Sequence, residues 1–285
     1  MKYAIGVDIG GTHVTAGIVN LEGGSLIPET LTRKHIDPDG TADQVISRWA
    51  EIIREASDKH AIAPSQIGMA MPGPFDYENG ISLIKGLHKY EQLYGLNVKE
   101  LLSAALGTVP GNIRLINDAS AFLLGEQHCG AAKGYDNFVC ITLGTGLGSA
   151  AWYNGQLEEG DLYSTAYRSA SAEDYLSSRW ITGSYRALTA EQCAGAKEVA
   201  QRMATDPVAR QIFVQFGQHL GNILVQRYGQ QRPQAVIIGG NIAKAWDAFI
   251  PHALEIIRGS GYEVELIPAM LGEEAALIGA AYLFT

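Results

Sequence analysis

Short apolar runs separated by glycine, proline and polar residues make up the first half of the chain. The runs at residues 3–8, 67–71 and 113–116 each predict a buried strand. Gly10-Gly11 ends the first run, and the apolar residues 14–19 that follow predict a return strand. The chain therefore opens with a predicted β-hairpin.

The first predicted helix begins behind Thr41, which forms a capping-box pattern with Gln44. The apolar residues that follow recur on one helical face: Val45, Ile46, Trp49, Ile52, Ile53 and Ala56. A second helix is predicted at residues 119–128, directly after the strand at 113–116. The first half thus alternates strands and helices, which is typical of an α/β protein.

The second half repeats this theme, with an apolar strand at residues 138–143, a glycine turn at 144–148 and a return strand at 150–153. The later predicted elements are helical sequence at 189–228, a strand at 235–238, a helix at 246–257, a strand at 264–267 and a closing helix at 273–283. A shift of 134 positions superposes residues 6–10 on residues 140–144. This match suggests an internal duplication.

The simplest architecture is a duplicated α/β protein with two lobes and a cleft between them. We expect an N-terminal lobe at residues 1–117 and a C-terminal lobe at 118–285 that carries the second glycine hairpin. The closing segment, residues 273–285, is expected to be able to pack back on the first lobe.

Both glycine turns carry the groups that a nucleotide phosphate requires. Glycine allows backbone N–H groups to approach phosphate oxygens closely, and Gly10-Gly11 is followed by the hydroxyl of Thr12. Asp8 offers a carboxylate for Mg²⁺, directly or through water. Gly144-Thr145-Gly146 offers a similar cradle. A plain glycine hairpin is the alternative for either turn alone, and their occurrence in corresponding places favours phosphate binding.

Two better-known phosphate motifs do not fit. The chain contains no P-loop pattern of Gly-x4-Gly-Lys-Ser/Thr. The glycines at residues 144–148 superficially resemble a dinucleotide-binding fingerprint, which must lead into a helix. Residues 150–153 instead predict a strand, so a Rossmann site is rejected.

Asp118 lies where a predicted strand meets a helix. It has two interpretations: a helix N-cap, a role that Asn117 could equally fill, or a general base that accepts a proton from an attacking hydroxyl. Its position alone favours the cap.

Composition narrows the classes of function. The chain has 285 residues, of which 47% are hydrophobic and 18% charged, as expected for a globular enzyme. A net charge of -9 argues against general binding of nucleic acid or anionic membranes. Cys129, Cys140 and Cys193 are odd in number and far apart, which argues against a disulfide framework or a cysteine zinc site. No signal peptide or membrane span is recognisable, so the expected location is the cytoplasm.

Taken together, the motifs resemble the ROK family of repressors and sugar kinases, which shares the duplicated, ribonuclease H-like fold of actin, hexokinase and Hsp70. The resemblance spans nearly the whole chain. It rests on residues 8–12 (Asp-Ile-Gly-Gly-Thr), 71–74 (Met-Pro-Gly-Pro), 117–119 (Asn-Asp-Ala), 143–148, 236–242 and 272–281.

The resemblance implies an ATP-dependent, glucokinase-like phosphotransferase that acts on a hexose and is often a homodimer. Nucleotide-binding residues would be Gly10, Gly11, Thr12, Gly144, Thr145, Gly146, Gly239, Gly240 and Asn241, with Asp8 organising Mg²⁺. Asn117 would bind a sugar hydroxyl, Asp118 would be the general base, and Gly73 and Pro74 would lie on the acceptor side.

The chain departs from the family pattern between residues 156 and 172. It lacks the family's Glu-x-Gly-His and its zinc-binding cysteines, so zinc is not expected and two usual sugar ligands are missing or replaced. Glu173 matches a later sugar-binding glutamate, although a surface acid at a helix start is the alternative. This departure keeps open a non-catalytic sensor of sugar or nucleotide. A repressor is disfavoured because seven residues precede Asp8 and leave no room there for a helix-turn-helix.

Overall fold

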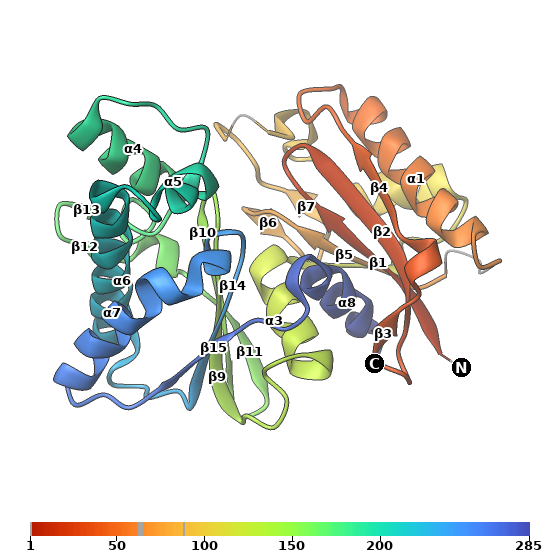
Figure 1. The fold of residues 1–285 in the computed structure, drawn as a ribbon. Coiled ribbons are helices and arrows are strands. Elements are labelled where there is room, and N and C mark those ends of the chain that lie inside the picture. The colour runs from red at the N-terminus through yellow and green to blue at the C-terminus, as the bar shows by residue number, and fades with distance from the viewer. Residues whose placement is uncertain (1, 62–64, 88) are drawn as a thin grey trace. The chain divides into compact units, whose positions relative to one another are not determined.

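A computed structural model describes residues 2–61, 65–87 and 89–285. Internal contacts divide the described chain into two compact units. Unit 1 comprises the described residues up to Lys133 together with Glu273–Thr285, and unit 2 comprises Gly134–Gly272 (Figure 1). This division differs from the expected lobe boundary at residue 118, because the helix that begins there packs within unit 1. The closing segment packs on unit 1 as well.

Unit 1 is built on a six-stranded sheet with the order β3-β2-β1-β5-β8, in which β4 also pairs with β2. Strands β1 and β2 form the predicted antiparallel hairpin, and β5 and β8 extend the sheet in parallel with β1. Its strands are β1 (Tyr3–Ile9), β2 (His13–Asn20), β3 (Ser25–Leu26), β4 (Thr32–His35), β5 (Ile67–Met71) and β8 (Ile113–Asn117). The carboxyl ends of β1, β5 and β8 therefore lie at one edge of the sheet.

Two pairs of helices accompany this sheet. Helices α1 (Ala42–Asp58) and α2 (Val98–Leu106) share a buried apolar cluster with β1, β5 and β8. Helix α8 (Ala275–Ala281) packs on β1 and β5, and α3 (Asp118–Cys129) packs against α8 (Figure 1). The capping box of α1 is confirmed, because Thr41 and Gln44 exchange side-chain and backbone hydrogen bonds.

Glycines allow α8 to lie unusually close to its neighbours. A Cβ atom at Gly68 of β5 would lie 1.8 Å from the carbonyl oxygen of Ala280. A Cβ at Gly279 would lie 1.8 Å from the carbonyl oxygen of Ala121 on α3. These contacts leave no room for a side chain, so the glycines fix the closing helix against both the sheet and α3.

Unit 2 repeats the hairpin-plus-parallel-strands pattern in a sheet of order β11-β10-β9-β14-β15. Its strands are β9 (Asn137–Leu143), β10 (Leu147–Tyr153), β11 (Gln156–Glu159), β14 (Ala235–Gly239) and β15 (Glu265–Pro268). Strands β1 and β9 begin and end 134 positions apart, and β2 and β10 begin 134 positions apart. The predicted duplication of the hairpin is thereby visible in the structure.

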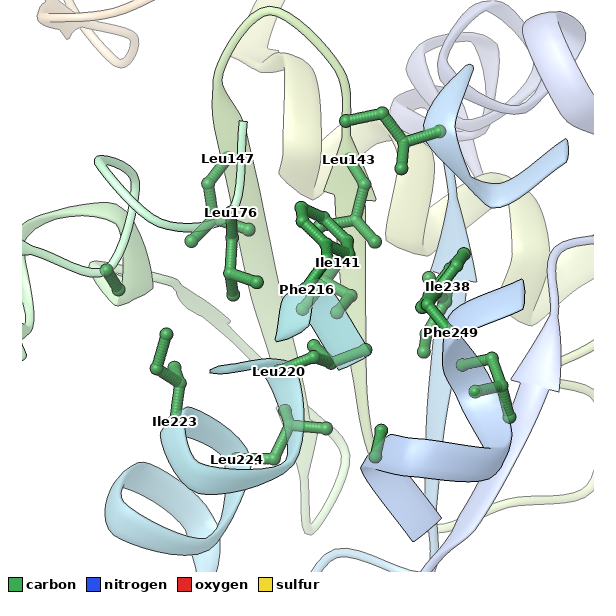
Figure 2. Close-up of a cluster of buried hydrophobic side chains, with 14 of the residues drawn as sticks. Ile141, Leu143, Leu147, Leu176, Phe216, Leu220, Ile223, Leu224, Ile238 and Phe249 are labelled. Atoms are coloured by element: carbon green, nitrogen blue, oxygen red, sulfur yellow. The ribbon is translucent and has the colours of Figure 1, made fainter. Parts of the chain in front are cut away.

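The core of unit 2 joins this sheet to its helices. Figure 2 shows Ile141, Leu143 and Leu147 of the β9–β10 hairpin together with Phe216 and Leu220 of α6 and Phe249 of α7. The helices are α4 (Ser178–Thr189), α5 (Ala196–Arg202), α6 (Pro207–Tyr228) and α7 (Trp246–Gly259). The predicted helical stretch at 189–228 is thus α5 and α6, and α4 ends where that stretch was expected to begin.

Short elements complete both units. Unit 1 carries the two-stranded hairpin β6 (Phe75–Asp76) and β7 (Ile81–Ser82), and unit 2 carries β12 (Ala166–Tyr167) and β13 (Ala170–Ser171). The 3-10 helices are η1 (Pro28–Thr30), η2 (Glu91–Leu93), η3 (Pro110–Asn112), η4 (Leu162–Ser164), η5 (Ile242–Ala245), η6 (Gly272–Glu274) and η7 (Tyr282–Phe284). The predicted helix at 273–283 is therefore α8 with a 3-10 turn on either side.

Candidate active site

The first glycine turn joins β1 to β2 in unit 1. The Gly10 N–H donates to the carbonyl oxygen of His13 at 2.9 Å, which closes the turn. Gly11 and Thr12 are exposed, and no acceptor among the described residues takes their backbone N–H groups. The turn thus presents two unpaired N–H groups and the Thr12 hydroxyl, which is hydrogen-bonded to the His13 ring at 2.9 Å. Such groups suit a phosphate.

Tyr90 holds this turn in place, although it lies 80 residues further along the chain. Its hydroxyl donates to the carbonyl oxygen of Gly10 at 2.5 Å, and its buried ring packs edge-on against Trp49. Burial, and then the charge of Asp8, raise the pKa of Tyr90, so the hydroxyl remains a donor. No local sequence pattern marks Tyr90 as a site residue, because its partner lies 80 residues away.

Asp8 lies near the carboxyl end of β1 and is partly buried. The pKa of its carboxyl is raised to about 6: burial is the largest cause, Asp118 and Glu273 also raise it, and Arg33 acts against them. Arg33 in turn pairs with Glu273 at 2.8 Å. No donor among the described residues hydrogen-bonds the Asp8 carboxylate. A carboxylate that lacks donors and lies near a second acid fits a bound cation.

The carboxyl end of β8 carries the two predicted substrate residues. Asn117 is the N-cap of α3: its Oδ1 accepts from the N–H groups of Ala119 at 2.9 Å and Ser120 at 3.3 Å. Its Nδ2 donates to the Tyr77 hydroxyl at 3.2 Å. The capping role that the sequence left open between two residues therefore belongs to Asn117. One N–H of its amide group remains available for a ligand.

Asp118 is the first residue of α3 and is exposed. Its Oδ1 accepts from the Ala119 N–H at 2.8 Å, while its other oxygen has no donor among the described residues. Desolvation is the largest cause that raises the pKa of this carboxyl, and the Ala119 N–H and the charge of Lys89 act against it. One oxygen is thus oriented and the other is open, which suits a group that takes a proton.

Gly73 and Pro74 follow β5 and are joined by a cis peptide bond. A Cβ atom at Gly73 would lie 3.1 Å from the Tyr77 hydroxyl and 3.9 Å from Asn117 Nδ2. The structure therefore brings the predicted acceptor-side element beside Asn117, at the sheet edge that also carries Asp8.

The second glycine turn joins β9 to β10 in unit 2. The Gly144 N–H donates to the carbonyl oxygen of Gly146 at 3.0 Å, and the N–H groups of Thr145 and Gly146 have no acceptor among the described residues. The Glu173 carboxylate accepts from the Leu147 N–H at 3.0 Å and pairs with Arg179 at 3.0 Å. Glu173 therefore contacts the turn itself.

The third glycine element, Gly239-Gly240-Asn241, ends β14 beside the second turn. Gly239 pairs with Thr142 across the parallel strands, and a Cβ at Gly240 would lie 2.3 Å from the carbonyl oxygen of Leu143. Gly240 has a φ of +89°, a conformation that glycine adopts without strain. Unit 2 thus brings together the residues predicted to bind the phosphates and the adenosine.

The described residues contain neither a cluster of metal-binding side chains nor a membrane-spanning helix. No three His, Cys, Asp or Glu side chains of the described chain lie together as a metal-binding group. No helix within residues 2–61, 65–87 and 89–285 is long and apolar enough to cross a membrane.

Comparison with known proteins relates the chain to one family and to several sugar kinases. The family model for the ROK family matches residues 4–163 and 168–285. Glucokinase of Thermotoga maritima is 38% identical over 156 residues, which is 55% of this chain and 46% of that enzyme. Beta-glucoside kinase of Listeria monocytogenes is 27% identical over 303 residues, covering 100% of this chain and 97% of that enzyme.

Solved structures show the same fold. A ROK hexokinase from Thermus thermophilus superposes with a TM-score of 0.81 at 24% identity, covering 99% of both chains. A ROK family glucokinase from Streptomyces griseus, solved with glucose and AMPPNP, gives 0.80 at 23% identity over 99% of both chains. The predicted α/β fold of the actin-like ATPase group is thereby confirmed.

Proposed function

The chain belongs to the ROK family, and on that premise we propose that it transfers the γ-phosphoryl group of ATP to a hydroxyl of a hexose or hexose derivative. The observation that carries the proposal is Asp118, with one oxygen oriented by the Ala119 N–H and the other open. Because catalysis of phosphoryl transfer rests on positioning and charge stabilisation, one oriented carboxylate suffices to orient the nucleophile. An intact base favours the kinase over the non-catalytic sensor.

We assign the remaining roles in the same way. Asn117 and the element Gly73-Pro74 hold the sugar beside Asp118, which accepts the proton of the attacking hydroxyl. The unpaired N–H groups of both glycine turns bind phosphate oxygens, and Gly239-Gly240-Asn241 contacts the adenosine. Mg²⁺, when bound, neutralises charge on the phosphates, and Asp8 would hold it directly or through water. The homodimer and the cytoplasmic location stay predictions.

Asp118→Asn tests the base. The amide oxygen can still accept from the Ala119 N–H, so folding should be kept while kcat falls about 10²- to 10⁴-fold. Release of ADP would be followed over a panel of hexoses, amino sugars and β-glucosides, with the exposed Asp136→Asn as the matched control. Unchanged kcat in Asp118→Asn would contradict the assignment, and no turnover of any sugar by the wild type would contradict the kinase.

A further inference from the structure

Glu173 was expected to bind the sugar, and its contacts in unit 2 indicate a further role. We propose that Glu173 is a positioning residue that holds the second glycine turn in its nucleotide-binding shape. This inference rests on the proposed function, because it concerns how the same enzyme binds ATP.

One short segment, residues 173–178, holds both ends of the turn. At the end of the turn, the Leu147 N–H donates to Glu173 Oε2 at 3.0 Å. At its beginning, the Gly144 carbonyl oxygen accepts from the Ser178 N–H at 2.8 Å. Between these contacts, the N–H groups of Thr145 and Gly146 find no acceptor in the described chain. The segment therefore fixes the ends of the turn and leaves its central donors available.

Gly146 makes the approach of Glu173 sterically feasible. A Cβ atom at this position would lie 2.7 Å from Glu173 Oε2, so a larger residue would push the carboxylate away from the Leu147 N–H. The requirement for glycine here arises from the glutamate as well as from a phosphate.

Both oxygens of Glu173 are already engaged. While Oε2 accepts from Leu147, Oε1 pairs with Arg179 at 3.0 Å. The Glu173 side chain is 29% exposed and that of Arg179 is 71% exposed. Arg179 also compensates the negative charge that Glu173 would otherwise bring close to a phosphate. Each carboxylate oxygen has a further lone pair, so these two contacts hold the turn and still leave Glu173 able to accept from a sugar hydroxyl.

The segment is itself anchored in the core of unit 2. Leu176 and Leu147 belong to the same buried cluster (Figure 2). Tyr175 and Trp180 each pack edge-on against the buried ring of His219 on α6, with ring centroids 5.0 Å apart. These packed side chains close to Glu173 in the sequence resist its displacement, so its carboxylate stays within hydrogen-bond distance of the Leu147 N–H.

The test compares binding of the nucleotide with use of the sugar. Titration calorimetry with Mg-ADP, in the absence of sugar, would be run on the wild type, Glu173→Ala and Glu173→Gln. We expect Glu173→Ala to weaken ADP binding about tenfold, the size expected for losing one hydrogen bond to a charged group. Glu173→Gln should lose less, about threefold, because its amide oxygen still accepts from Leu147 while the pair with Arg179 is lost. The KM for ATP should rise in parallel with the loss of ADP affinity.

Glu263→Gln is the matched control, because it removes the same charge from an exposed position of unit 2. Unchanged ADP affinity in Glu173→Ala overturns the inference; a raised KM for the sugar in the same variant would then leave Glu173 as a sugar ligand alone. Should Glu173→Ala not fold, unchanged ADP affinity in Glu173→Gln overturns it equally. Wild-type protein that binds no ADP would contradict the proposed function, and with it the inference.

Discussion

Asp8→Asn should make the folded protein more stable while it removes the carboxylate proposed to hold Mg²⁺. In the folded chain the pKa of Asp8 is raised from 3.8 to about 6, first by burial and then by Asp118. A raised carboxyl pKa means that the folded state binds the proton more tightly than the unfolded state does. Below pH 3.8 both states hold that proton and no penalty exists. Between pH 3.8 and about 6 the unfolded state loses the proton while the folded state still holds it, so stability falls across this range and stays at its lower level at higher pH.

The magnitude follows from the two pKa values. They differ by about 2, and a difference of 1 corresponds to ~1.4 kcal/mol, which gives an upper limit of ~3 kcal/mol at pH 8. Asp8 keeps some exposed surface, so solvent screening reduces this value, and we expect a gain of ~2 kcal/mol for Asp8→Asn. The gain should be about half as large at pH 5 and absent at pH 3.5.

Urea denaturation at pH 8, 5 and 3.5 would measure this gain, with Asp136→Asn as a control for loss of one exposed charge. The same variant should lose most of its turnover, because a neutral amide is a poor ligand for Mg²⁺. A gain that is equal at pH 8 and pH 3.5, or absent at pH 8, would refute the electrostatic explanation. Such a result would mean that the folded protein compensates the charge of Asp8.

Two further changes test contacts within unit 1. Tyr90→Phe keeps the ring against Trp49 but leaves the Gly10 carbonyl without its donor, so unfolding should cost ~1 kcal/mol less and the KM for ATP should rise; an unchanged KM would separate Tyr90 from the turn. Gly279→Ala should destabilise the fold by ~3 kcal/mol in a thermal or urea melt, because its Cβ would lie 1.8 Å from the Ala121 carbonyl oxygen. Gly183→Ala, in the middle of α4 with open space around it, is the control and should stabilise by ~1 kcal/mol; similar effects of both changes would refute the packing argument.

The parts of the fold that could be predicted are those with local causes. The hairpins at 3–20 and 137–153 followed from alternating apolar runs broken by glycine, and α1 from its capping box and apolar face. Helix α2 was missed although Asn97 caps its beginning and Gly107 ends it in a left-handed conformation, a signal that the sequence contains. Helix α4 was missed because its buried face is narrow, with Ile181 and Tyr185 as its only buried residues.

The chemistry of the candidate site could be predicted by residue type but not by contact. Asn117 and Asp118 were identified as a pair. Which of them caps α3 depends on which side chain reaches the first N–H groups of the helix, and in the structure this is Asn117. The neighbours of Glu173 in the sequence suggested a sugar ligand, but they gave no sign of its contacts within unit 2. Those contacts are with Leu147, the first residue of β10, and with Arg179, six residues further along the chain. No periodicity or spacing within the chain encodes such choices.

The two copies of the hairpin are held by corresponding contacts. Gly10 and Gly144 are 134 positions apart and occupy the same place in the two hairpins. In each hairpin the carbonyl oxygen of this glycine accepts a hydrogen bond from a later segment, from the Tyr90 hydroxyl in unit 1 and from the Ser178 N–H in unit 2. The donor is thus a side chain in unit 1 and the first backbone N–H of helix α4 in unit 2. Because the proposed phosphate contacts of each turn are its free N–H groups, other residues can hold its carbonyl oxygens without blocking those contacts. The glycines therefore supply the shape of each turn, and residues distant in sequence keep it.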